Sequence, residues 1–69
     1  MSEHAVRVAV DRLLAQPSPD AAVDVLRAAD AGPDSARRDA LARLDTYLRQ
    51  TPDSYQRSVA DCIIALRRA

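Results

Sequence analysis

The stretch PSPDAAVDVLRAADAGPD, residues 17–34, decides the fold of this chain. It contains Ser18-Pro19-Asp20, three residue types that together favour a helix start. A serine at the cap accepts a hydrogen bond from a free backbone N–H, a proline suits the first helical position, and an aspartate in the first turn complements the positive helix end. The pattern therefore predicts a helix over 19–31.

Similar tripeptides occur twice more, as Gly32-Pro33-Asp34 and Thr51-Pro52-Asp53. Gly32 can also close the preceding helix in a left-handed conformation, which would make a tight joint with the helix that follows. With these starts, the sequence predicts helices over about 3–16, 19–31, 33–50 and 52–68. The linkers of one to three residues would force neighbouring helices to fold back or cross sharply.

Charge spacing supports the helix assignment, because five acid–arginine pairs stand four residues apart with the acid first, which is the favourable order on a helix. We interpret these charges mainly as a solvated face. The pairs are Glu3/Arg7, Asp34/Arg38, Asp39/Arg43, Asp45/Arg49 and Asp53/Arg57.

Each predicted helix has one apolar side, and no segment alternates as a strand would. The predicted fold is therefore all-α, a compact four-helix bundle with very short inter-helix joints, in a single domain over 1–69. The expected core positions, helix by helix, are Val6, Ala9, Val10, Leu13 and Leu14; Ala22, Val23, Val25, Leu26 and Ala29; Ala40, Leu41, Leu44, Tyr47 and Leu48; and Tyr55, Val59, Cys62, Ile63 and Leu66.

The composition excludes several classes of protein. Ten basic and ten acidic side chains balance, which argues against a protein that coats nucleic acid or an anionic membrane. No apolar run reaches the roughly 18 residues of a membrane span, and the start Met-Ser-Glu-His does not read as a signal peptide. A single cysteine cannot form an internal disulfide. We therefore expect a cytoplasmic protein.

Fourteen of the apolar residues are alanines, so the core is thin for a chain of 69 residues. Chains this small often add a metal, a disulfide or a second copy of themselves. This chain lacks the residues for a metal site and for a disulfide. Self-association, a partner, or an unusually well-capped bundle remains as the source of stability.

Two large apolar residues, Val8 and Ile64, fall off the predicted stripes. Ile64 is surrounded at helical spacing by Arg57, Asp61 and Arg68. An apolar residue ringed by charge is typical of an interface anchor with a polar rim, although a single exposed valine or isoleucine is also ordinary. We hypothesise a small non-enzymatic protein–protein interaction or regulatory module that binds a partner protein or itself, with a homodimer plausible.

Catalytic and metal-binding patterns are missing from the sequence. Cys62 lies within an apolar stripe, where a thiol acts as a small hydrophobe. His4 has no second histidine or nearby cysteine for a metal site or a catalytic pair. We therefore expect no enzyme activity, no cofactor, no metal and no small-molecule substrate.

One alternative is DNA binding. Ala28 and Gly32 stand four apart across the second joint, which resembles the small-residue and turn-glycine portion of the helix-turn-helix pattern. That resemblance implies contacts from Arg37, Arg38 and Arg43 on the third helix. Arg38 stands where the pattern expects an apolar residue, and three aspartates on the same helix would repel phosphates. Arg37 projects near the middle of that helix's apolar side, where it either snorkels or pairs with an acid from another helix.

A further alternative rests on Asp34-Ser35-Ala36 and Asp53-Ser54-Tyr55, which resemble the Asp-Ser-Leu motif of acyl and peptidyl carrier proteins. The resemblance implies a phosphopantetheine group on Ser35 or Ser54. The leucine of the motif is missing in both places, and helix capping alone explains a serine near a helix start.

Overall fold

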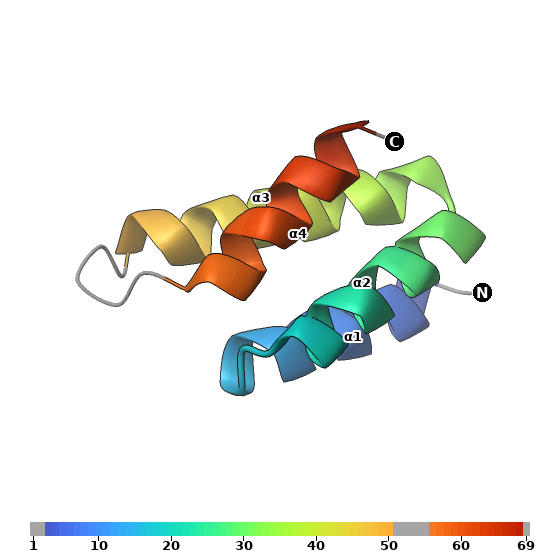
Figure 1. Ribbon diagram of the computed structural model, residues 1–69. Coiled ribbons are helices and arrows are strands. Elements are labelled where there is room, and N and C mark those ends of the chain that lie inside the picture. Colours follow the sequence, from blue (N-terminus) through green and yellow to red (C-terminus); the bar gives the residue numbers. More distant parts are fainter. Residues whose placement is uncertain (1–2, 51–55, 69) are drawn as a thin grey trace.

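A computed structural model describes residues 3–50 and 56–68, and these residues form four α-helices (Figure 1). The predicted all-α class is confirmed, and within the described ranges there is no strand. The predicted bounds of the first three helices are right to within one residue. The helices are α1 (Glu3–Ala15), α2 (Pro19–Ala31), α3 (Asp34–Gln50) and α4 (Arg57–Arg68).

Ser18 begins α2 in the predicted way. Its backbone is extended, with φ −157° and ψ 159°, and its Oγ accepts a hydrogen bond from the Ala21 N–H at 3.1 Å. Its carbonyl oxygen accepts the first helical bond, from the Ala22 N–H, at 3.1 Å. Pro19 occupies the first turn, where its missing N–H leaves no helical bond unmade.

The predicted left-handed cap at Gly32 is wrong. Gly32 has φ −103° and ψ −180°, and no described glycine has positive φ. Its N–H instead donates to the Ala29 carbonyl at 3.3 Å. The reason lies in Pro33, because a residue that precedes proline is held in extended conformations. The Pro33 carbonyl then accepts from the Arg37 N–H at 3.3 Å, and α3 starts at Asp34.

The fourth helix begins later than predicted. The expected start at Thr51-Pro52-Asp53 lies outside the described residues, as do Tyr55 and the expected Asp53/Arg57 pair. Gln56 is described and is not helical, which corrects the predicted range 52–68. The Gln56 carbonyl accepts from the Ala60 N–H at 3.1 Å, so this residue stands at the cap position just before α4.

The four helices form two hairpins stacked in two layers (Figure 1). One hairpin pairs α1 with α2 and the other pairs α3 with α4, while α1 also packs on α3 and α2 on α4. Helices α2 and α3 make fewer contacts because they lie diagonally across the bundle. The α2/α4 side is therefore opposite the α1/α3 side. The radius of gyration is 10.7 Å, close to the ~11 Å expected of a folded chain of this length.

The core consists of small aliphatic side chains, and the described residues bury no polar or charged residue. Leu13 and Leu44 are the largest of the fully buried side chains. Alanine supplies six of the fifteen buried positions. The core is Val6, Ala9, Val10, Leu13, Ala22, Val25, Ala28, Ala29, Ala36, Ala40, Leu44, Val59, Cys62, Ile63 and Leu66.

Most of the predicted core positions are confirmed, but the prediction that Val23 belongs to the core is wrong. It is 43% exposed, whereas Val25 is fully buried. The two residues lie about 160° apart around an α-helix, so one flat contact surface cannot bury both. Ala28 and Ala36 are buried although they were not predicted. Five predicted positions are only partly buried against the core: Leu14, Leu26, Leu41, Tyr47 and Leu48.

Several charged side chains connect helices instead of lining one helix. Of the predicted acid-first pairs within residues 3–50, only Asp45 and Arg49 lie within 4 Å, at 3.9 Å. Asp45 also accepts from Arg67 of α4 at 3.4 Å. Arg43 of α3 bonds Asp11 of α1 rather than Asp39. Each such exposed pair contributes about 0–1 kcal/mol, so together they favour this arrangement only modestly.

We predict that Ser18→Ala lowers the free energy of unfolding by about 1 kcal/mol, because the Ala21 N–H loses its acceptor. Urea denaturation followed by circular dichroism measures the change. Ser18→Asp serves as the control, because a carboxylate at this position can still accept the bond. Equal stability of Ser18→Ala and the wild type would contradict the capping role.

Candidate interaction surface

An apolar groove runs between α2 and α4 and has a volume of about 450 Å³. It continues into a neighbouring hollow of about 370 Å³, with which it shares Val23, Leu26 and Ala65. We call the two together the α2/α4 groove. Its α2 wall is Pro19, Ala22, Val23, Leu26, Arg27 and Asp30; its α4 wall is Arg57, Ser58, Asp61, Cys62, Ala65 and Leu66; and Arg37 of α3 closes one end.

Of the two large, exposed hydrophobic residues in the described part of the chain, Val23 lines this groove and Ile64 is a neighbour of its lining residue Ala65 on α4. Val23, 43% exposed, lines it from α2. Ile64, 53% exposed, is not one of the lining residues; it is next in sequence to the lining residue Ala65 and one helical turn from Asp61. Its exposed side chain therefore adds apolar surface on α4 beside the groove.

The predicted charged rim of Ile64 is present on α4. Arg57 and Asp61 form an exposed ion pair with Nε and Oδ2 3.8 Å apart. Arg68 is exposed one turn beyond Ile64. Together the four residues occupy positions 57, 61, 64 and 68, a spacing that places them in one row along the helix.

Val8 does not belong to this surface. It is half-buried in a separate hollow between α1 and α2, beside Arg12 and Asp24. The structure thus brings together Arg57, Asp61, Ile64 and Arg68, and leaves Val8 apart from them. Sequence reasoning missed Val23 as a surface residue because it assigned this residue to the core. The signal was available in its position, which is nearly opposite Val25 on the helix.

Arg37 reaches the end of the groove from α3. Its side chain is 23% exposed, and Nη2 lies 3.9 Å from Oδ1 of Asp30 on α2. The Arg37 Nε is buried without a hydrogen-bond partner in the described structure. Of the two predicted outcomes, pairing with an acid of another helix is therefore the one observed, although the distance makes it a loose pair.

Cys62 forms part of the groove floor and is buried, as expected of a core residue. Its Sγ lies 3.9 Å from the Ala22 carbonyl oxygen, to which the thiol can donate a weak hydrogen bond across the α2/α4 contact. Burial raises the pKa of the thiol from 9.0 to about 11, since the surrounding apolar atoms disfavour the thiolate. A thiol of this kind is a poor nucleophile at neutral pH.

The raised pKa predicts a loss of stability at high pH. The unfolded thiol ionises above pH 9.0 while the folded thiol stays neutral until about pH 11, so alkali favours unfolding between these values. The slope is at most about 1.4 kcal/mol per pH unit. Urea denaturation from pH 8 to pH 11 measures this slope. Cys62→Ala is less stable from the start because of its cavity, but it should lack the loss of stability that ionisation of the thiol causes. Parallel pH profiles for the two proteins would contradict the assignment.

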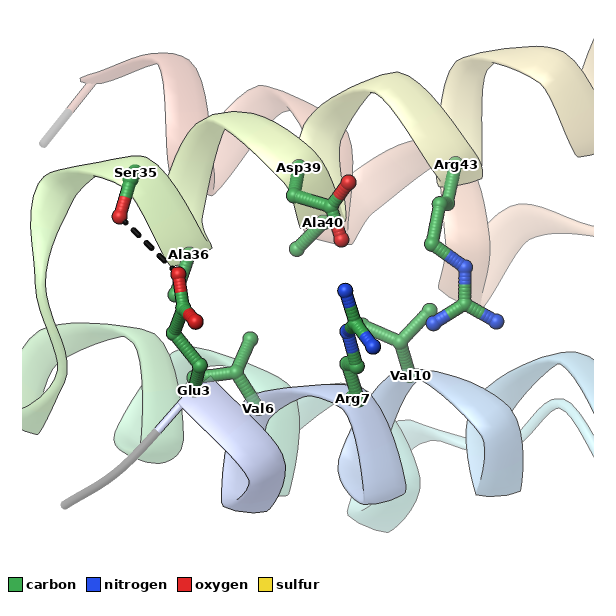
Figure 2. A pocket seen from close by; sticks show the side chains of 9 residues that line it. All are labelled: Glu3, Val6, Arg7, Val10, Ser35, Ala36, Asp39, Ala40 and Arg43. Atoms are coloured by element: carbon green, nitrogen blue, oxygen red, sulfur yellow. Dashed lines mark hydrogen bonds between the residues drawn. The ribbon is translucent and has the colours of Figure 1, made fainter.

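Another hollow, of about 220 Å³, lies between α1 and α3 (Figure 2). Charged and polar side chains of both helices line it above a floor of small apolar residues. Ser35 Oγ donates a hydrogen bond to Glu3 Oε1 at 3.2 Å, and Arg43 bonds Asp11. None of the nine lining residues is a histidine or a cysteine, so the lining of this hollow supplies no imidazole that could activate Ser35 as a nucleophile. Within residues 3–50 and 56–68, no three potential metal ligands cluster.

The residues of the two alternative hypotheses are dispersed. Arg37 faces the α2/α4 groove, whereas Arg43 lines the hollow on the opposite, α1/α3 side. Arg38, the third arginine of the DNA-binding hypothesis, is exposed. Ser35 is exposed near the start of α3, and Ser54 lies outside the described residues. The three arginines thus share no single face.

Comparisons of the chain with protein-family models, with characterised proteins and with solved structures found no match. None of the helices described is long and apolar enough to cross a bilayer. The surface chemistry of the bundle is therefore the basis for a functional proposal.

Proposed function

We propose that this chain is a small, non-enzymatic protein–protein interaction module whose binding surface is the α2/α4 groove with Ile64 at its edge. The observation that carries the proposal is the exposed Val23 in the apolar α2/α4 groove, together with the exposed Ile64 next to the groove residue Ala65 on α4. The proposal includes a cytoplasmic location, since a lone buried thiol requires no oxidising compartment.

The chemistry of the groove supports this proposal over catalysis. Interfaces have apolar anchors at the centre and charged residues at the rim. Here Val23, Leu26 and Ala65 supply the apolar centre, and Arg57 and Asp61 stand at the edge. The thiol of Cys62 in the groove is held neutral by its burial.

The same arrangement favours protein binding over DNA binding. Duplex DNA is bound by cations gathered on one face. In this bundle Arg37 and Arg43 lie on opposite sides, and each is close to an aspartate of another helix. These pairs would have to break before the arginines could neutralise phosphates.

We predict that Ile64→Asp and Val23→Asp each abolish partner capture. The assay uses tagged chain as bait, with both untagged chain and lysate of the source cells as prey, analysed by mass spectrometry. A carboxylate in place of either apolar side chain would have to be desolvated on binding, which is costly. Because both side chains are exposed, circular dichroism of the variants should match that of the wild type.

Ala42→Asp is the matched control, because Ala42 is exposed on the α1/α3 side and lies opposite the groove. The proposal is supported if a prey protein, which can be the untagged chain itself, binds the wild type and Ala42→Asp but does not bind either groove variant. Capture that is identical for all four baits would contradict it.

A further inference from the structure

Resting on the proposed function, we infer that the occupant of the α2/α4 groove is a second copy of this chain, with the two α4 helices antiparallel about a two-fold axis. A two-fold interface requires a surface that complements itself. The row formed by Asp61, Ile64 and Arg68 on α4 meets this requirement, since an acid and a base stand on either side of the apolar residue.

The register of the pair follows from residue positions. When Ile64 of one copy lies opposite Ala65 of the other, Asp61 lies opposite Arg68, and the two-fold axis repeats both contacts. The large Ile64 side chain then meets the small Ala65, which lines the groove next to Val23. In the other direction of packing, two parallel α4 helices would set Asp61 against Asp61 and Arg68 against Arg68, and like charges would repel.

The exposure of these residues is compatible with such an interface. Within residues 3–50 and 56–68, the ion pair of Asp61 is the loose, exposed one with Arg57 at 3.8 Å, so Asp61 can turn to a partner at little cost. The α4 helix has twelve residues and is therefore about 18 Å long, so a contact along it is small compared with the ~1,200 Å² at the lower limit of a specific interface. We therefore expect a weak, concentration-dependent dimer.

The test is a charge swap measured by sedimentation equilibrium over a wide range of protein concentration. Asp61→Arg and Arg68→Asp should each weaken the dimer about tenfold or more, because each places like charges opposite one another at two positions. The double variant restores opposite charges, and we expect its Kd to return to within about threefold of the wild type. Asp39→Arg makes the same charge change on the α1/α3 side and should leave the Kd unchanged.

Three results would overturn the inference: a wild-type chain that stays monomeric at the highest concentration, a dimer that neither single variant weakens, and a double variant that is not rescued. A different result decides whether the proposed function fails. If the wild type is monomeric while another protein is captured through Ile64, the groove is a binding surface for a different partner. If no protein, this chain included, depends on Ile64 and Val23, the proposed function fails as well.

Discussion

The close packing of alanine-rich helix faces is the constraint on which the rest of this structure depends. In the described part of the chain, six of the fifteen buried residues are alanines, and Leu13 and Leu44 are the largest side chains that are fully buried. Small side chains let helices approach closely and fill space without voids, but each contributes little apolar area. Two hairpins can therefore enclose a complete core, and the free energy gained by burial is small.

The packing of these helix faces also determines which apolar side chains remain exposed on the surface of the bundle. A helix turns by about 100° per residue, so α4 can direct Ile63 to the core only by directing Ile64 away from it, and α2 treats Val25 and Val23 in a similar way. Because α2 and α4 pack side by side, the exposed Val23 lines the groove between them, and the exposed Ile64 follows the groove residue Asp61 by one helical turn. A bundle with a thin core thus keeps two of its larger apolar side chains available to a partner, and their burial there would add stability that the monomer lacks.

Local chemistry made much of this fold predictable. Ser18-Pro19-Asp20 sets the start of α2 because capping depends on residues close in sequence, and the burial of Val59, Cys62, Ile63 and Leu66 follows from helical period alone. Two of the errors were avoidable from the sequence. Pro33 holds the preceding Gly32 in an extended conformation, and Val23 lies nearly opposite the buried Val25 on α2. Arg57, Asp61, Ile64 and Arg68 were grouped correctly on one helix, but the apolar groove beside them needs a second helix, which no single-helix pattern contains.

The most direct test of this account compares two valines on one helix. In urea denaturation at protein concentrations low enough to keep the chain dissociated, Val25→Ala should cost about 2 kcal/mol of unfolding free energy, because it removes two methyl groups from a fully buried site. Val23→Ala should change it by less than ~0.5 kcal/mol, as expected of a surface position. Equal losses for the two variants would mean that Val23 belongs to the core, and the groove would then have no free apolar edge on α2.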